Sequence, residues 1–292
     1  MLKILPQQFY QNPEVKKILV DGLSCVIHKE LAGPVFHKEG YVSTHAITLV
    51  LNGTMRIEND GGFLTHVSET QMVFLPKDLY MISDIIPDQG SFEAVVFFFD
   101  EQLIADFINS INLKTAKEKC VTHITLDYSK EIRIFTESLL QVYNKKELTH
   151  RNLTRIKLFE LLHLISSHQQ GNCFLTALAT LNNKERRSLR EFMNANFSKP
   201  LTIEDYAYLT GRSLSSFRRD FIEQFGVSPK QWLIEKRLEK AQELLSLNHT
   251  NVSTVALETG YENTSHFVKA FHKRYGISPK QFLMKKRKEV LV

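Results

Sequence analysis

The sequence predicts a two-domain α+β protein. An antiparallel β-domain with added helices precedes an all-α domain, which consists of two helix-turn-helix units joined by a long helix. The chain has 292 residues, of which 43% are apolar, and this length is sufficient for two domains of about 100–200 residues each. Positive charge is concentrated in the last third of the chain, and the same third contains an internal repeat.

The balance of charge changes at about residue 180. Residues 1–180 carry 17 Lys and Arg against 20 Asp and Glu, a net charge of −3, whereas residues 181–292 carry 20 against 12, a net charge of +8. This asymmetry is typical of a polyanion-binding module joined to a module with another task. No apolar stretch approaches the ~18 residues of a membrane-spanning helix, and residues 1–10 lack the features of a signal peptide. We expect a cytoplasmic protein with no membrane partner.

The repeat has a period of 50 residues. Residues 217–237 read FRRDFIEQFGVSPKQWLIEKR, and residues 267–287 read FVKAFHKRYGISPKQFLMKKR, with ten of the 21 positions identical. Such self-similarity indicates a duplicated structural unit. Upstream, a capping box at Thr202 and Asp205 predicts a short helix from Ile203, and Asn251 caps its counterpart from Val252. Glycines that suit a left-handed residue end these helices, at Gly211 and Gly260.

A second helix follows the turn in each copy. In the first copy, the spacing of apolar residues predicts a buried stripe at Leu214, Phe217, Phe221 and Phe225. The opposite face carries Ser215, Arg218, Arg219 and Ile222. In the second copy, the inward residues are Phe267, Ala270 and Phe271, and the outward residues are Ser265, Lys269 and His272. Both outward faces are therefore polar and basic.

A long helix is predicted between the copies. It begins at Ser228 and Pro229, an N-cap followed by proline at the first helical position, and runs to about Leu247. Its predicted core residues are Ile234, Leu238, Ala241 and Leu245, while Arg237 is interpreted as a structural residue. About 19 residues at ~1.5 Å each give ~28 Å, which suits two helices placed about one DNA turn (~34 Å) apart.

The first 180 residues alternate short apolar runs with turn signals, as antiparallel strands do. Strands are predicted at 46–51, 54–59, 63–67, 72–75, 80–82 and 91–99, with a hairpin turn at Asn52-Gly53. Helices are predicted at 102–111, 132–143 and 152–167. The three cysteines are far apart, and the histidines at 28, 37, 45 and 66 are scattered, so we predict no metal site, no cofactor and no catalytic residue.

An apolar stripe marks the helix at 152–167, with Ile156, Phe159, Leu162 and Ile165 at helical spacing. Two interpretations remain open: the stripe pairs two protomers, or it packs on the strands of its own chain. Residues 169–183 are predicted to form a linker between a regulatory and dimerisation domain, residues 1–168, and a DNA-binding domain, residues 184–292.

The C-terminal pattern resembles the AraC/XylS family of transcription regulators over about residues 185–288. The matching segments in the first half are 213–219, Phe221, 226–229, Arg237, Ala241 and 244–245; in the second half they are Val252, 255–256, 260–261, Phe267, Phe271, 276–279 and Phe282. Tyr261 departs from the phenylalanine that the family usually has. The strand, Asn-Gly, strand pattern followed by Phe74-Leu75-Pro76 is similar to the cupin-like β-barrel sensor domains of this family, so the resemblance implies such a barrel with dimerisation helices.

The resemblance also implies where DNA is contacted. By position, the expected contacts are Ser213, Ser215, Ser216, Arg218, Arg219, Thr264, Ser265, His266 and Lys269. Arg219 is the strongest candidate for reading a base, because arginine donates two parallel hydrogen bonds to guanine O6 and N7. Val268 offers only a contact to a thymine methyl group. We therefore expect the first unit to discriminate sequence and the second unit to add mainly affinity for phosphate.

The predicted function is that of a sequence-specific activator of transcription, with two recognition helices in successive major grooves of double-stranded DNA. The expected partners are promoter DNA, RNA polymerase and a second copy of the chain. The effector acting on the N-terminal domain is either a small molecule or a regulatory protein; the run Val95–Phe99 followed by Asp100 resembles the type III secretion activators, which respond to proteins. The alternative is a cupin-type metalloenzyme with a DNA-binding tail.

Overall fold

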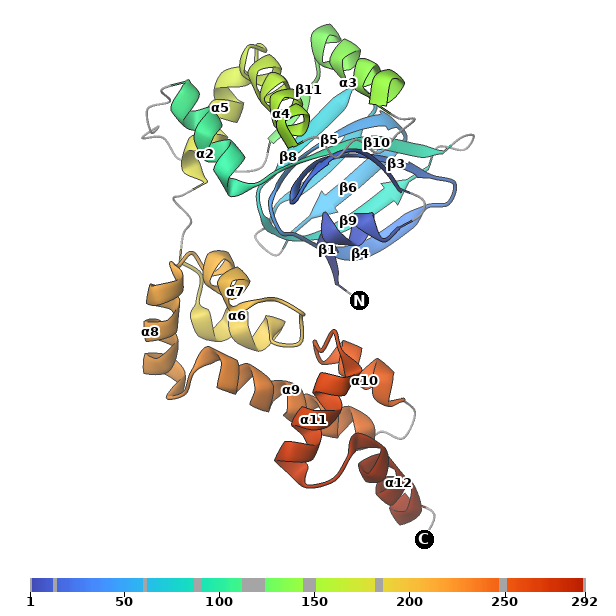
Figure 1. Cartoon of the computed structure of the whole chain (residues 1–292), viewed down its shortest axis with the longest axis vertical. Helices are drawn as coiled ribbons and strands as arrows, with labels where there is room; N and C mark the ends of the chain where they lie inside the picture. The colour runs from blue at the N-terminus through green and yellow to red at the C-terminus, as the bar shows by residue number, and fades with distance from the viewer. Residues whose placement is uncertain are drawn as a thin grey trace. The chain divides into compact units, whose positions relative to one another are not determined.

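A computed structural model describes residues 2–12, 15–59, 62–86, 91–111, 124–143, 151–181, 186–246 and 251–290. The chain forms two compact units, residues 2–183 and residues 184–292 (Figure 1). The division lies close to residue 180, where the balance of charge changes sign. The first unit contains all the strands of the described residues, and the second contains helices only. This is the predicted two-domain α+β architecture.

The first unit is built on two β-sheets. One sheet has the strand order β1-β4-β9-β6-β7 and the other β11-β8-β5-β10-β3-β2. Neighbouring strands are antiparallel except β1 and β4, which are parallel. The strands are Lys3–Leu5 (β1), Val15–Asp21 (β2), Ser24–Leu31 (β3), Val35–Val42 (β4), His45–Asn52 (β5), Thr54–Glu58 (β6), Leu64–Ser68 (β7), Gln71–Leu75 (β8), Asp78–Ile85 (β9), Phe92–Phe99 (β10) and Ile124–Asp127 (β11); a short helix, Gln7–Tyr10 (α1), follows β1. The two sheets share one core, an arrangement compatible with the predicted cupin-like domain.

Strand β10 shows that the larger sheet is the middle layer of the unit. Because strand residues alternate between faces, one set lies in the core shared with the smaller sheet: Ala94, Val96 and Phe98. The other set lies in a second core shared with helices: Val95, Phe97 and Phe99. Both faces of β10 are buried, which explains its nearly continuous apolar sequence.

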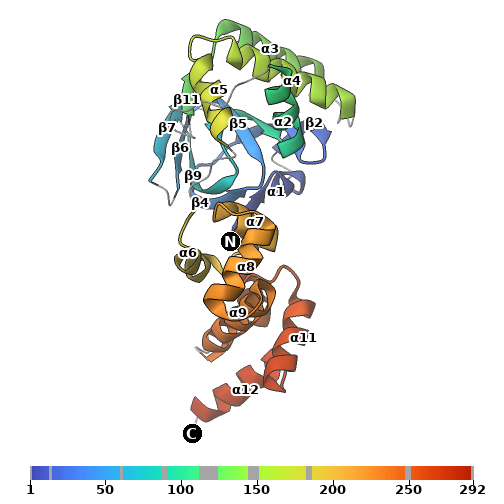
Figure 2. The ribbon, with the colours of Figure 1, turned by 90° about the vertical axis from the view of Figure 1, so that its left-hand side faces the viewer.

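Four helices supply that second core. They are Glu101–Ser110 (α2), Lys130–Tyr143 (α3), Arg151–Ser166 (α4) and Gly171–Thr180 (α5), and both views show them on one side of the strands (Figures 1 and 2). On α4, Leu162 and Ile165 are buried against the sheet, Phe159 is partly buried and meets Phe107 edge-on, and Ile156 is 60% exposed. Of the two interpretations of the stripe, packing on the strands of the same chain holds for Leu162 and Ile165, so the dimerisation role expected of these two residues is wrong: the unit's own sheet covers them.

Helix α5 corrects the predicted linker. Residues 171–180 are helical, and Phe174, Ala177 and Leu178 are buried in the core beneath α4. The ring of Phe174 meets that of Phe74 on β8 edge-on, with 5.4 Å between centroids. The polar residues on either side suggested a linker, but the apolar residues between them have helical spacing and complete the core. Residues 182 and 183 lie outside the described part of the chain.

The predicted strands agree with β5 to β10 to within three residues at each end, and Gly53 has the positive φ of +88° that the hairpin turn needs. Strands β1 to β4 and β11 were not predicted. Charged pairs such as Lys16-Lys17 and Lys29-Glu30 interrupt the alternation of apolar residues there. These edge and near-edge strands are recognised only from the partners with which they pair.

The second unit contains seven helices among its described residues. They are Leu189–Asn196 (α6), Ile203–Leu209 (α7), Leu214–Phe225 (α8), Pro229–Ser246 (α9), Val252–Glu258 (α10), Thr264–Tyr275 (α11) and Pro279–Val290 (α12). The predicted starts at Ile203, Pro229 and Val252 are confirmed, and the capping box of Thr202 and Asp205 is formed. Leu247, the predicted end of the long helix, lies outside the described residues.

Helix α9 has two buried faces rather than one stripe. Near its start, Trp232 and Leu233 are buried, and the indole of Trp232 packs edge-on against Phe221 and Phe225 of α8. Further along, the buried residues belong to the core of the second helix-turn-helix: Leu238, Ala241 and Leu245. Ile234 shares the direction of Leu238 but lies one turn earlier and is 39% exposed, so its assignment to the core stripe is wrong.

Candidate nucleic-acid interface

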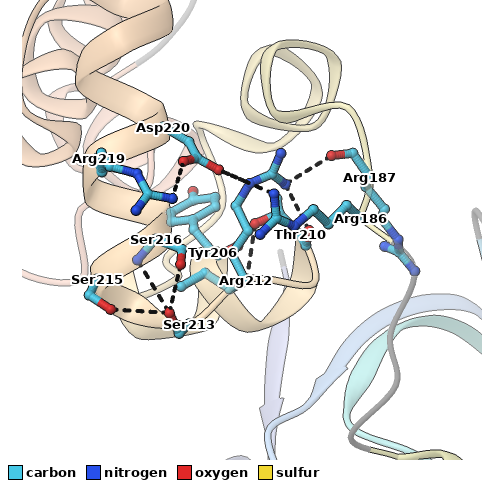
Figure 3. Close-up of polar contacts among 11 residues, drawn as sticks. Arg186, Arg187, Tyr206, Thr210, Arg212, Ser213, Ser215, Ser216, Arg219 and Asp220 are labelled. Carbon is cyan, nitrogen blue, oxygen red and sulfur yellow. Dashed lines mark hydrogen bonds and ion pairs between the residues drawn. The ribbon is translucent and has the colours of Figure 1, made fainter.

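The first recognition helix, α8, begins at a capped N-terminus. The Ser213 hydroxyl accepts a hydrogen bond from the Ser216 amide at 3.2 Å and lies 3.1 and 3.0 Å from the hydroxyls of Ser215 and Ser216 (Figure 3). The helix ends at Gly226, whose φ is +74°. Both ends are thus fixed by local chemistry, a serine cap and a left-handed glycine.

The two faces of α8 are separated as predicted. Phe217 and Phe221 are fully buried, whereas Ser215, Arg218 and Arg219 are exposed. The predicted base-reading side chains are therefore on one accessible face. Ser213 is exposed beside them, and Ser216 is partly buried, with its hydroxyl bonded to that of Ser213.

An ion network at the edge of this face was missed by the sequence analysis. Asp220 accepts hydrogen bonds from Arg212 Nε at 3.1 Å and from Arg219 Nη2 at 3.2 Å, and Arg186 Nη1 lies 3.9 Å away (Figure 3). The hydrogen bond from Arg212 is the main reason that the pKa of the Asp220 carboxyl is below its ordinary value. The only signal in the sequence was an acidic residue directly after two arginines on the predicted DNA-facing helix.

The second recognition helix, α11, repeats the scaffold with other polar groups. The Asn263 side chain accepts hydrogen bonds from the amides of Ser265 and His266, at 2.8 and 3.3 Å. Ser265, His266 and Lys269 are exposed, while Thr264 and Val268 are partly buried. Of the predicted contacts in this helix, Thr264 is thus the least accessible. The inward residues Phe267 and Phe271 are fully buried.

Arg237 of α9 joins the segment after α6 to the second helix-turn-helix. It donates hydrogen bonds to the carbonyl oxygens of Phe197 at 2.8 Å, Lys199 at 2.7 Å and Gly260 at 3.1 Å. The first two belong to the segment after α6, and the third belongs to the turn of the second helix-turn-helix. The structural role expected for Arg237 is confirmed, with backbone carbonyl oxygens as its partners.

Gly260 completes this junction. Its φ is +85°, and a Cβ atom added to it would lie 2.7 Å from the Ser198 carbonyl oxygen and 3.1 Å from the Arg237 guanidinium. Glycine is therefore required both by the left-handed backbone and by the close approach of two chain segments. The positions of α8 and α11 relative to each other depend on this junction and on α9.

Two buried histidines of the first unit have polar partners within it. His28 Nε2 lies 2.7 Å from Glu93 Oε1, and His45 Nδ1 accepts a hydrogen bond from the Lys77 amide at 3.4 Å. No three His, Cys, Asp or Glu side chains of the described ranges are grouped so that they would hold a metal ion. Across the same ranges, no helix has the length and apolar character needed to cross a bilayer.

Comparison with known proteins matches both units to described domain families. Residues 45–177 match the ExsA N-terminal regulatory domain, and residues 206–285 match a helix-turn-helix domain. The virulence regulon transcriptional activator VirF of Yersinia enterocolitica is 25% identical over 83% of this chain and 89% of its own length. The thermoregulatory protein LcrF of Yersinia pestis is 32% identical over 39% of this chain and 42% of its own length.

A third relative matches a similar part of the chain. The HTH-type transcriptional regulator ExsA of Pseudomonas aeruginosa is 29% identical over 42% of this chain and 45% of its own length. The two matched domains follow each other in the order that the sequence predicted, and the second is the duplicated helix-turn-helix domain described above. The chain belongs to the AraC/XylS family of transcription regulators.

Proposed function

We propose that the protein activates transcription by binding a specific double-stranded DNA sequence, with α8 and α11 in successive major grooves. The observation that carries this proposal is the duplicated helix-turn-helix. In each copy, two buried phenylalanines fix a helix whose opposite face is exposed, polar and basic. Helix α9 has 18 residues, about 27 Å at ~1.5 Å per residue, which is close to one turn of DNA. The relative VirF is named a transcriptional activator.

The two recognition helices divide the work of binding. Arg218 and Arg219 give α8 two guanidinium groups on its exposed face, and each can donate bidentate hydrogen bonds to guanine. Helix α11 presents Lys269, a compact charge without the planar fork of arginine. The first helix-turn-helix accordingly selects sequence, and the second adds phosphate contacts that hold the protein on DNA of any sequence.

The N-terminal unit is the regulatory part of this activator. Its match to the ExsA N-terminal regulatory domain supports this role. The effector is a small molecule or a regulatory protein, and the regulated step is recruitment of RNA polymerase in the cytoplasm. The protein acts by binding rather than by catalysis; metal analysis of the purified full chain tests the alternative of a cupin-type metalloenzyme.

A second protomer is expected to pair through the outer surface of α3 and α4. Because Leu162 and Ile165 are buried, the accessible apolar residues there are Ile134, Val142 and Ile156. Sedimentation analysis of the full chain at micromolar concentration tests this pairing. We expect a dimer that Ile156→Glu converts to a monomer, and a wild-type monomer at that concentration would contradict it.

The decisive experiment for DNA binding is selection of 40-base-pair duplexes from a random pool by the full chain, followed by gel shifts at several salt concentrations. We expect enrichment of one motif with two parts about 10 base pairs apart, and affinity that falls as salt rises.

Mapping of genomic binding sites with the full chain and with a chain lacking residues 1–183 then identifies the targets and the contribution of the regulatory unit. Failure of the full chain to enrich any motif would overturn the proposed function.

A further inference from the structure

Asp220 accepts hydrogen bonds from two arginines that have different environments. Its side chain is 14% exposed, so it is poorly placed to contact DNA itself. Oxygen Oδ2 accepts the hydrogen bond from Arg212, whose side chain is 8% exposed, and Oδ1 accepts the hydrogen bond from Arg219, whose side chain is 71% exposed (Figure 3). One carboxylate thus links a buried arginine to an exposed arginine on the predicted DNA-reading face.

Arg212 fixes the position of this carboxylate. Its Nη1 atom donates hydrogen bonds to the carbonyl oxygens of Arg187 at 3.0 Å and Thr210 at 2.8 Å. These carbonyls belong to the segment before α6 and to the turn before α8. Asp220 is consequently held to the backbone of the helix-turn-helix through a side chain that has little freedom to move.

The carboxylate restrains Arg219. Neighbouring residues on a helix point in different directions, so Arg219 must bend toward Asp220 to form this bond. Without a partner, its long and exposed side chain would sample many rotamers in solvent. The hydrogen bond to Asp220 uses one of the five guanidinium N–H groups. Four remain, and the pairing with guanine O6 and N7 requires two that are parallel. An arginine held in this way loses less rotamer freedom when it binds.

We propose that Asp220 is a positioning residue that sets the sequence specificity of the protein by holding Arg219 in the orientation that reads guanine. This inference rests on the proposed function. The second helix-turn-helix provides an internal contrast. The counterpart of Asp220, 50 residues later, is Ala270, which directly follows Lys269. The carboxylate is therefore present in the helix-turn-helix that carries arginine, which can form a bidentate pair. An alanine takes its place in the helix-turn-helix that carries lysine.

The test compares full-length wild type, Asp220→Asn, Arg219→Ala and the double variant. Asparagine keeps the size of the side chain and one oxygen that can accept from Arg212, but it places an amide N–H group or an uncharged oxygen toward Arg219. Glu223→Gln is the matched control, since it removes one exposed negative charge from the same helix. The probes are the 40-base-pair duplex enriched by wild type from a random pool and a scrambled duplex of the same composition.

We expect Asp220→Asn to lower the ratio of the two affinities about five- to tenfold, part of the discrimination of a bidentate pair, with less than a twofold change on the scrambled duplex. Repeated selection should relax the same base-pair position in Asp220→Asn and in Arg219→Ala. In the Arg219→Ala background, Asp220→Asn should have no further effect on the ratio. Glu223→Gln should leave the ratio and the motif unchanged.

Three results would overturn the inference. The affinity ratio of Asp220→Asn could be unchanged, or it could be higher, which would mean that Asp220 competes with DNA for Arg219. Alternatively, Asp220→Asn could lower the ratio equally in the Arg219→Ala background. The fluorescence of Trp232, the single tryptophan of the chain, reports whether the unit is folded. If Asp220→Asn unfolds it, Asp220→Glu, which keeps the charge but moves the carboxylate by one methylene, replaces it with the same expectation. A wild type that enriches no motif would instead refute the proposed function.

Discussion

The two helix-turn-helix units share a scaffold and differ in what surrounds the basic residue of the recognition helix. In the first unit, Arg219 is bonded to Asp220, which Arg212 ties to the backbone. In the second unit, Lys269 is exposed and is followed by Ala270. The comparison teaches that the two copies share one fold, whereas their polar faces differ: the first copy holds its arginine in an ion network, and the second presents a lysine beside an alanine.

The retained features are those that determine the fold. Each recognition helix buries two phenylalanines, ends in a left-handed glycine and is followed by Ser-Pro at the start of the next helix. The divergent features lie on the solvent side, where a substitution costs little stability. Substitutions on the solvent side are therefore expected to change function. Substitutions at the junction that joins the two helix-turn-helix units are expected to change stability.

The largest effect is expected at that junction. Gly260→Ala places a Cβ atom 2.7 Å from the Ser198 carbonyl oxygen at a φ of +85°. We expect this substitution to destabilise the second helix-turn-helix by about 3 kcal/mol, because backbone strain and steric overlap add. Gly276→Ala, at a φ of +75° with open space around the added atom, should cost about 1 kcal/mol. Hydrogen exchange of α10 and α11 amides measures both, and equal protection losses would show that the close approach to Ser198 is unimportant.

The next effect separates specificity from affinity. Arg219→Ala should remove about 1–3 kcal/mol of discrimination between the selected and the scrambled duplex, because the bidentate donor is lost. Lys269→Ala should weaken binding to both duplexes alike and reduce the slope of log affinity against log salt by about 0.9. Titrations at four or more salt concentrations measure both quantities. Uniform loss on all sequences for Arg219→Ala would contradict the assigned division of work.

The smallest effect compares the helix caps. Asn263 accepts two backbone N–H hydrogen bonds and Ser213 accepts one, so we expect Asn263→Ala to cost about 1 kcal/mol and Ser213→Ala about 0.5 kcal/mol. Thermal unfolding monitored by circular dichroism, with Trp232 fluorescence for the first unit, measures the pair. A larger loss from Ser213→Ala would indicate that its bonds to Ser215 and Ser216 also support the helix.

The sequence predicted the parts of the fold that are decided locally. Caps such as Thr202 and Asn251, the turn at Gly53 and the alternation of buried phenylalanines in α8 depend on neighbours within a few residues, and the structure confirms them. The exposed positions of Ser215, Arg218, Arg219, Ser265 and Lys269 follow from the same helical period. Strands β1 to β4 were missed because their charged residues hide the pattern that pairing later explains.

Other errors arose where burial depends on a distant segment. From the sequence, Leu162 and Ile165 could contact either a second protomer or the strands of their own chain. The structure shows that the larger sheet of the same unit covers them. Ile234 has the spacing of a core residue, yet it is 39% exposed, since the core of the second helix-turn-helix begins one turn later at Leu238. Helical spacing identifies an apolar face, but it does not identify the surface that the face contacts.

By itself, the sequence determined the two-domain organisation, the duplicated helix-turn-helix and the faces that are candidates for DNA contacts, because these depend on composition, on the internal repeat and on helical periodicity; its motifs also carried the resemblance to the family. Only the tertiary structure decided that α5 belongs to the first unit, that Arg237 joins the two helix-turn-helix units through carbonyl oxygens, and that Asp220 links Arg212 to Arg219. The bond between Arg212 and Asp220 spans 8 residues and that from Arg237 to Phe197 spans 40, while α5 completes a core shared by several elements. Such contacts are set by how helices and sheets pack, which no local pattern specifies.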